Sequence, residues 1–538
     1  MAFRFILMRI LAVLISFFSI NSIIAQTINP NPWVMDTDTT KTVTYKNPII
    51  PGFYSDPSVC RVGEDYYLVT SSFEYFPGVP IFHSRDLVNW KQVGHVIHRK
   101  EQIPKDLNIF AATIRHHKGT FYMITTNVST KGNFYMTAKN PEGPWSNPIW
   151  IDVAEIDPDL FFDDDGRSYV ISSTFELTEI DLSTGKLIGE KRKVWNGNGG
   201  RYPEAPHIYK KDGFYYLMAA EGGTEEAHSV TISRSNSIWG PYINNPSNPI
   251  ATHVNVAGMG KHIQGIGHAD IVQAHDSSWW MVLHGYRSVA GYPPHHTLGR
   301  ETCLVPVNWP EGGWPVVNGN GTVPEEIRHS TLPLQKLAVT PTRDEFQNTS
   351  LGLKYNTIQP YDEKHIYVDP SESQLVLKGT SLKIGDKGSP TFVGQRLTDI
   401  SFTSSTLLEF NPSGENEVAG MTLTNNGSHF DLVVSKSDNT RVVYVQLQFG
   451  QTVYRSKEFI LKPGPVNLKI EGTGPEFIFS YTQNGENFSI IEKADARFLS
   501  TETVGWFTGV YIGLYATGNG KSSKELARYN YFEYEGRQ

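Results

Sequence analysis

The chain has 538 residues, a formal net charge of −8 at pH 7 and a pI near 6.1. This length exceeds what one hydrophobic core usually organises, so two domains are expected. No cluster of Lys and Arg stands out, which argues against a nucleic-acid partner. Aromatic residues make up 12% of the chain, beside 47 Gly and 32 Pro, a mixture typical of short strands, tight turns and sugar-binding surfaces.

Residues 1–25 have the pattern of a signal peptide. Arg4 and Arg9 precede a broken apolar run over residues 10–24, and Ala25 closes the run before polar sequence. The run is too short and too interrupted for a membrane span. No Cys lies near the cleavage point, so the sequence gives no indication of a lipid anchor. We therefore expect export to the periplasm or the medium, without a membrane anchor.

The chain has two cysteines, Cys60 and Cys303, far apart in the sequence. An oxidising compartment permits a disulfide between them, but two buried free thiols are equally compatible with the sequence. No Cys and His spacing typical of a metal site is present.

One pattern recurs five times over residues 44–335: a small or acidic residue, a short strand, a turn and an aromatic-rich strand. The repeats begin at Ser55, Phe110, Ile156, Pro203 and Gly267. Turn residues such as Lys118-Gly119 and Asp212-Gly213 separate the two strands, which is the signal of a β-hairpin. The interval of roughly 45–65 residues is the size of a propeller blade. The sequence predicts an all-β fold with a five-bladed β-propeller.

The first strand of each blade lines the central channel of a propeller, so the residues that begin each repeat should meet there. Counting back from the aromatic strands gives Asp56, Phe110 or Ala111, Asp157, Glu204 and His268 at equivalent positions, within about one residue. Each of these acidic residues alone could be an ordinary turn or strand-end residue. Three carboxylates gathered around one channel are costly to desolvate, which favours a functional cluster.

Carboxylates with separated roles are the machinery of glycoside hydrolysis. One must be ionised to activate a water, and another must be protonated to donate to the leaving oxygen. A third carboxylate beside the acid favours its protonated form by like-charge repulsion.

Four segments resemble glycoside hydrolase family 43: NPIIPGFYSDPSVCRVGEDYYLVTSS, IDPDLFFDDDG, PEAPHIYKKDGFYYLMAAEGGT and LGRETCLVPVNWPEGGWPVV. Members of that family are five-bladed propellers that act as β-xylosidases and α-L-arabinofuranosidases. The resemblance implies that Asp56 is the general base, Asp157 the residue that tunes the acid, and Glu204 the general acid. It also implies inversion, which requires the base and acid carboxyls to stand roughly 6.5–9.5 Å apart.

The resemblance also suggests neighbours in the sugar pocket. Phe76 and Phe110 match positions whose rings wall the pocket, although the family often has Trp-Ala-Pro where this chain has Phe110-Ala111-Ala112. Thr224, His268 and Arg300 match sugar-contacting or axial positions. Phe76 and Phe110 could instead be ordinary core, Arg300 a blade-closing ion pair and His268 a buried histidine.

No cofactor or metal is predicted. In some relatives the axial histidine, here His268, helps to hold a calcium ion. The local composition does not demand a metal, and a network of water molecules would serve equally.

Residues 340–538 do not repeat the blade pattern. Alternating runs such as SQLVLKG, VVYVQLQFG and FIFSYTQNG predict an antiparallel β-sandwich. This part resembles the concanavalin-like C-terminal domain of many family members. The resemblance implies that a loop of the sandwich adds an aromatic ring to the pocket, and Phe507 in GWFTGVYIGLY is the candidate. The alternative is that Trp506 and Phe507 belong to the core of the sandwich.

The sequence thus predicts an exo-acting enzyme that releases terminal α-L-arabinofuranose from plant hemicellulose side chains or oligosaccharides, of the arabinoxylan or xyloglucan type. A β-D-xylosidase, or an enzyme with both activities, is the alternative within this class. An endo-acting arabinanase would need an open groove without an appended domain. A non-catalytic carbohydrate-binding propeller is the alternative from a different class.

Overall fold

The computed structural model describes residues 43–103, 106–130, 132–256, 263–289, 294–329, 334–335, 337 and 341–537. The predicted signal segment, residues 1–25, lies outside these residues. The described residues are nearly all in strands and loops, with one 3₁₀-helix, η1 (Ala496–Leu499), and one short α-helix, α2 (Thr501–Val504). Among them, no helix has the length and apolar character needed to cross a membrane.

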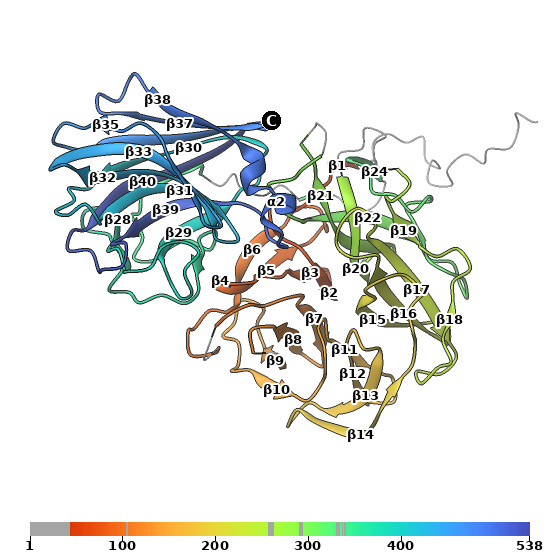
Figure 1. Ribbon diagram of the computed structural model, residues 1–538. Coiled ribbons are helices and arrows are strands. Elements are labelled where there is room, and N and C mark those ends of the chain that lie inside the picture. Colours follow the sequence, from red (N-terminus) through yellow and green to blue (C-terminus); the bar gives the residue numbers. More distant parts are fainter. Residues whose placement is uncertain are drawn as a thin grey trace, which may run out of the picture. The chain divides into compact units, whose positions relative to one another are not determined.

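Five antiparallel sheets, the blades, succeed one another from residue 58 to residue 317 and surround a common axis (Figure 1). Blades 1 and 2 contain β2 (Ser58–Val62), β3 (Asp65–Val69), β5 (Gly78–Ser84), β6 (Lys91–Ile97), β7 (Thr113–His117), β8 (Thr120–Asn127), β9 (Gly132–Ala138) and β10 (Ile149–Ile151). Blades 3 and 4 contain β11 (Asp159–Phe162), β12 (Ser168–Ile171), β13 (Glu176–Asp181), β14 (Lys186–Lys193), β15 (Glu204–Lys211), β16 (Phe214–Glu221), β17 (Ser229–Ser235), β18 (Ile243–Asn244) and β19 (Ala251–Thr252). Blade 5 contains β20 (Ile263–Gln273), β21 (Trp279–Arg287), β22 (Glu301–Asn308) and β23 (Val316–Val317). The predicted five-bladed propeller is confirmed.

The first strands of the blades form a closed ring. Strand β2 contacts β7 and β20, β11 contacts β7 and β15, and β15 contacts β20. Each first strand also pairs with the second strand of its own blade through a tight turn. The predicted turn tips carry the left-handed backbone that such turns require, as at Gly119 (φ 72°) and Gly213 (φ 81°). The ring brings residues that begin distant repeats to one axis.

A separate two-stranded ladder joins the two ends of the propeller. Strand β1 (Val43–Lys46), which precedes blade 1, pairs with β24 (Glu326–His329), which follows blade 5. The Asn47 side-chain amide donates hydrogen bonds to the carbonyls of Leu304 and Pro324, and its oxygen accepts one from the Leu304 amide. These hydrogen bonds connect the segment that follows β1 to blade 5 and to the segment after it.

The C-terminal part consists of two antiparallel sheets around an apolar core. One sheet contains β25 (Arg343–Asp344), β27 (Ile366–Asp369), β28 (Gln374–Leu377), β30 (Ser401–Glu409), β36 (Val466–Thr473), β37 (Glu476–Thr482), β38 (Ser489–Asp495) and β40 (Ala527–Arg537). The other contains β29 (Thr391–Arg396), β31 (Val418–Asn425), β32 (Ser428–Ser437), β33 (Thr440–Phe449), β34 (Thr452–Arg455), β35 (Phe459–Ile460) and β39 (Tyr511–Thr517). This arrangement is the predicted sandwich.

Propeller and sandwich residues also pair directly. Strand β4 (Tyr75–Phe76) of the propeller forms a ladder with β26 (Thr357–Ile358). The ring of Tyr75 stacks on that of Tyr511, with centroids 3.8 Å apart. These contacts are made at the end of the segment 53–76, which also contains the predicted base Asp56.

Cys60 and Cys303 are both buried and unbonded. Of the two alternatives that the sequence left open, the structure shows free thiols. Burial raises the pKa of the Cys60 thiol to about 12, so it stays protonated and unreactive at neutral pH.

Candidate active site

A small cavity of about 90 Å³ lies where the blades converge. Eight of the nine predicted site residues line it: Asp56, Phe110, Asp157, Glu204, Thr224, His268, Arg300 and Phe507. The other lining residues are Phe73, Ala111 and Ile156. Side chains from all five blades, and one from the sandwich, therefore meet at a single site.

Phe76, predicted to wall the sugar pocket, does not line this cavity. Phe76 lies on β4 and belongs to the apolar core of blades 1 and 2, which also contains Val69 and Ile97. Phe73, three residues earlier, lines the cavity instead and contacts Phe110, with ring centroids 4.8 Å apart. Because the segment continues into the ladder with β26, the ring of Phe76 is turned into the core. Both aromatic residues lie in one short stretch, and the sequence does not show which of them faces the channel.

An unusual backbone conformation recurs where the blades begin. Asp56, Asp157, Ala205 and His268 all have φ between 47° and 56°, in the left-handed region that L-residues seldom adopt. Each stands two residues before a position on the axis, and the ladder is irregular at Glu204 and at Gly267. Glu204 thus precedes the equivalent position by one residue, within the predicted tolerance. Of these four residues, Asp56, Asp157 and His268 line the cavity.

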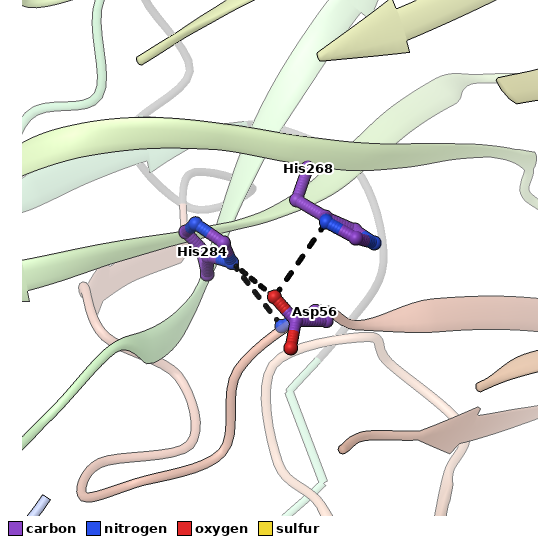
Figure 2. A group of neighbouring side chains, drawn as sticks. All are labelled: Asp56, His268 and His284. Atoms are coloured by element: carbon purple, nitrogen blue, oxygen red, sulfur yellow. Dashed lines mark hydrogen bonds and ion pairs between the residues drawn. The ribbon is translucent and has the colours of Figure 1, made fainter. Parts of the chain in front are cut away.

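Asp56 is 4% exposed and is held by hydrogen bonds on both carboxylate oxygens. Oδ1 lies 2.7 Å from Arg300 Nη1. It also lies 3.0 Å from His284 Nδ1 and 3.6 Å from His268 Nδ1 (Figure 2). Oδ2 accepts from the hydroxyls of Ser55 and Ser71. Burial alone raises the pKa of Asp56, but Arg300, His268 and His284 more than offset this and hold it well below its usual range. Asp56 is therefore ionised, as a base must be.

Asp157 has the opposite electrostatic environment. It is 5% exposed and accepts a hydrogen bond of 3.2 Å from the Ala205 amide. Its carboxylate, one oxygen of Glu204 and a ring nitrogen of His268 lie within 4.8 Å of one another. Burial, followed by the charges of Glu204 and Asp56, raises the pKa of Asp157 well above its usual range. Burial and the neighbouring charges thus favour the protonated form of Asp157.

Glu204 begins β15 and its side chain is 21% exposed, more than those of the other two carboxylates. The preceding loop is anchored by Glu221, which is buried and accepts from the amides of Asn198 and Gly200 and from the Thr231 hydroxyl. A Cβ on Gly200 would lie 2.4 Å from a Glu221 oxygen, so this close approach requires glycine. The loop is held rigidly while the Glu204 carboxyl remains accessible to a ligand.

Arg300 links the base to the sandwich. Besides Asp56, its guanidinium donates to Thr224 Oγ1 at 3.0 Å and to the Phe507 carbonyl at 3.4 Å. The guanidinium carbon lies 5.8 Å from the centroid of the Phe507 ring. Phe507 contacts Phe73, Phe110 and Trp506 and is still 37% exposed, so it is not sandwich core. Its ring closes one side of the cavity.

A second layer of buried polar residues lies on the axis, and sequence reasoning missed it. Arg115 donates to Asp159 and Asp270, and its guanidinium lies 3.0 Å from His207 Nδ1. Ser58 donates to Asp270 at 2.7 Å. Four of these residues stand two positions after Asp56, Asp157, Ala205 and His268, so the period of two in a strand would have found them. Arg115 pairs with charges from two other blades and thereby holds the channel together.

A larger cavity of about 660 Å³ shares Thr224, Arg300 and Phe507 with the small one. It is also lined by Tyr286 and His296 of the propeller and by Glu502 and Trp506 of the sandwich. His296 Nδ1 lies 2.7 Å from Glu502 Oε1, and the ring of His296 stacks on Tyr286 with centroids 4.0 Å apart. An aromatic, polar space of this kind suits the part of a saccharide beyond the scissile bond.

Among the residues that the structure describes, two sets of side chains are close enough to share a cation: Asp56, His268 and His284, and Asp157, Glu204 and His268. Calcium takes about six to eight oxygen ligands. The first set offers one carboxylate, which already binds Arg300, together with two imidazoles. The second offers two carboxyls, of which Asp157 favours its protonated form, and one imidazole. Neither set fits calcium.

The model of glycosyl hydrolases family 43 matches residues 45–315, and that of the beta xylosidase C-terminal concanavalin A-like domain matches residues 343–535. A non-reducing end α-L-arabinofuranosidase of Bacteroides ovatus is 41% identical, covering 91% of this chain and 94% of that protein. A xylosidase/arabinosidase of Butyrivibrio fibrisolvens is 39% identical, covering 92% and 99%.

A solved structure from Bacteroides ovatus, described as xyloglucan PUL GH43B, superposes with a TM-score of 0.88 at 40% identity. It covers 92% of this chain and 100% of that one. The matches extend over both the propeller and the sandwich. The chain belongs to glycoside hydrolase family 43 and is a glycoside hydrolase.

Proposed function

We propose that this enzyme releases terminal α-L-arabinofuranose from the non-reducing ends of plant hemicellulose side chains or oligosaccharides, with inversion. The observation that carries the proposal is the small cavity, which combines three carboxylates with the rings of Phe73, Phe110 and Phe507. A space of about 90 Å³ suits one terminal sugar rather than the middle of a chain. The likeness to the Bacteroides ovatus arabinofuranosidase supports the choice of sugar.

In the proposed reaction, Asp56 removes a proton from a water that attacks the anomeric carbon. Its ionised state, maintained by Arg300, suits this role. Glu204 protonates the departing glycosidic oxygen, and its greater exposure places it toward the leaving group. Asp157 shares a proton with Glu204 and favours the protonated acid. Arg300, Thr224 and His268 offer hydrogen-bonding groups to the sugar hydroxyls.

A panel of 4-nitrophenyl glycosides tests this proposal, with the products of the preferred substrate followed by proton NMR. We expect hydrolysis of the α-L-arabinofuranoside and initial release of β-L-arabinofuranose. Initial release of the α-anomer would refute inversion and require a nucleophile instead of a base.

A β-D-xylosidase activity, alone or with the first, is the second candidate. The likeness to a xylosidase/arabinosidase, 39% identical over 92% of the chain, favours it. The ratio of kcat/KM for the arabinofuranoside and the β-D-xylopyranoside decides between the two sugars. Branched arabinoxylan and xyloglucan oligosaccharides then identify the natural polymer.

We also propose that the enzyme is exported, on the basis of the signal pattern in residues 1–25. Expression of the full chain in a Gram-negative host, followed by fractionation and N-terminal sequencing, tests this. We expect a mature N-terminus near Gln26 in the periplasmic or medium fraction. A full-length protein retained in the cytoplasm would contradict export.

A further inference from the structure

His228 is fully buried just before β17, and one of its ring nitrogens has no hydrogen-bond partner. This nitrogen is Nε2, and Glu204 Oε1 lies 3.7 Å from it. That distance is too long for a hydrogen bond, but such contacts in a site without substrate often shorten during the reaction. An orphaned buried nitrogen is costly, which points to a partner gained during the cycle.

The neighbours of His228 decide which of its nitrogens carries the proton. Nδ1 lies 3.3 Å from the carbonyl oxygen of Gly265, which can only accept a hydrogen bond. Nδ1 therefore carries the proton, and Nε2 presents a lone pair toward Glu204. A lone pair attracts a protonated carboxyl and repels an ionised one.

His284 continues the chain of contacts toward the base. Its Nε2 lies 3.1 Å from Nδ1 of His228 and accepts a hydrogen bond from it. The contacts of Thr224 are consistent with this assignment. Its hydroxyl oxygen accepts a hydrogen bond from Arg300, so its hydroxyl hydrogen is available for Nε2 of His284, 3.4 Å away.

The proton of neutral His284 then lies on Nδ1, 3.0 Å from Asp56 Oδ1. The amide of Asp56 also directs its N–H at this nitrogen from 3.2 Å. Because the carboxylate is closer and charged, we assign the Nδ1 proton to the contact with the carboxylate.

We propose that His228 is a positioning residue for the general acid: its bare Nε2 accepts a hydrogen bond from protonated Glu204 and, through His284, ties this state to ionised Asp56. The proposal rests on the proposed roles of Glu204 and Asp56. With the acid protonated and the base ionised, a donor faces an acceptor at each side-chain contact from Glu204 through His228 and His284 to the Asp56 carboxylate. With the protons reversed, two hydrogens meet at Asp56 and a carboxylate meets a lone pair at Glu204. The two imidazoles thus select the competent protonation state.

The ring of His228 is held in place by glycine. A Cβ on Gly267 would lie 2.4 Å from Nδ1 of His228, so this ring occupies the space of a side chain and cannot turn freely. Asp157 and His268 lie close to Glu204, His268 also interacts with His228, and Arg300 faces His284. All of them remain in the variants below, so a change can be assigned to His228.

The decisive variant is His228→Phe, which keeps a flat ring but removes both nitrogens. We expect kcat/KM to fall about 10- to 100-fold for an oligosaccharide whose leaving group needs protonation, and less than about threefold for a 2,4-dinitrophenyl glycoside. We also expect the alkaline limb of kcat/KM to move to lower pH, because the acceptor for the protonated acid is lost. Equal losses on both substrates, or an unmoved limb, would overturn the proposal.

His95→Phe is the matched control, because His95 is a buried histidine on β6 away from the cavity. It should leave the leaving-group dependence and the pH profile unchanged.

If His228→Phe does not fold, Gly267→Ala displaces the ring without removing it and should give the same pattern. Nitrogen NMR of the unaltered enzyme supplies an independent measurement. We expect the signals of a proton on Nδ1 of His228, and a proton on Nε2 would contradict the assignment.

A second comparison distinguishes failure of the proposed function from failure of the inference about His228. If Glu204→Gln shows no leaving-group dependence, the acid itself is misassigned. If it does and His228→Phe does not, only the inference about His228 is wrong.

Discussion

The interiors of the propeller and the sandwich are built from the same kind of strand but hold opposite chemistry. The propeller axis contains Arg115, Asp159 and Asp270 in a buried network, with the three carboxylates nearby. The sandwich interior is a continuous apolar cluster in which residues such as Leu432 and Leu468 are completely buried. Removing one partner from a buried ion pair costs about 3–5 kcal/mol, so the axis keeps its charges only because they are paired. One interior is organised for chemistry and the other for stability.

The two regions meet in a third cluster, which explains why the sandwich bears on catalysis. Phe53, Phe73 and Tyr75 of the propeller pack there with Tyr511 and Phe392 of the sandwich. The apolar packing typical of the sandwich thereby reaches the wall of the sugar cavity. Substitutions on the axis should change chemistry, those at the junction binding, and those in the sandwich core stability.

Asp56→Asn should give the largest effect. We expect kcat to fall about 1,000-fold or more, because the amide cannot take a proton from water, while arabinose binding measured by calorimetry persists. Asp152→Asn, at a carboxylate that is 99% exposed, is the control and should behave as the unaltered enzyme. A variant that retains a tenth of the activity would show that Asp56 is not the base.

Glu204→Gln should cause a smaller loss that depends on the leaving group. We expect about a 100-fold decrease for arabino-oligosaccharides and little change for 2,4-dinitrophenyl arabinofuranoside, whose leaving group departs without protonation. Parallel measurement of kcat on both substrates checks this. A loss of equal size on both would assign Glu204 a role in binding instead.

Phe507→Ala tests the junction. We expect KM to rise about tenfold with kcat nearly unchanged, since the ring contributes apolar contact to the ground and transition states alike. The melting temperature should stay within a few degrees because the ring is partly exposed. Phe498→Ala, at an exposed aromatic residue of the sandwich outside both cavities, is the control. An unchanged KM would remove Phe507 from the sugar site.

Asp157→Asn should have the smallest effect on the rate and the clearest effect on the pH dependence of stability and activity. Burial and the charges of Glu204 and Asp56 raise the pKa of Asp157, so the folded state holds a proton that the unfolded chain releases above about pH 4. Stability therefore falls as pH rises from that point, and the neutral amide should remove this penalty and raise the melting temperature at pH 8.

The same variant should move the alkaline limb of kcat/KM to lower pH, because the acid loses its like-charge neighbour. Thermal melts at pH 5 and pH 8, together with a pH–rate profile, measure both effects. A limb that stays in place would contradict a tuning role for Asp157.

The sequence was most informative where a pattern repeats. The turn residues and aromatic strands recur five times, and this alone led to the propeller and to the convergence of Asp56, Asp157 and Glu204. The sandwich followed from alternation, which needs only the period of a strand.

Features that depend on the path of the chain between strands were not visible. The choice between Phe73 and Phe76 depends on a ladder with residues far along the chain, and the sequence contains no signal for it. The contacts of His228 depend on close packing against Gly267 and on the carbonyl of Gly265, which only coordinates reveal. Arg115 was missed because its partners come from other blades.

Arg396 of the sandwich has a consequence for how the enzyme fails. This residue is 3% exposed; its Nε donates to the carbonyl of Phe53 at 2.6 Å, and its guanidinium stands 4.3 Å from the ring centroid of Tyr54. The segment leading to the catalytic base is therefore braced by the other domain. Heating that unfolds the sandwich should therefore abolish activity while the blades are still folded. An isolated propeller would contain the catalytic carboxylates but would lack the contacts of Arg396 that hold this segment in place.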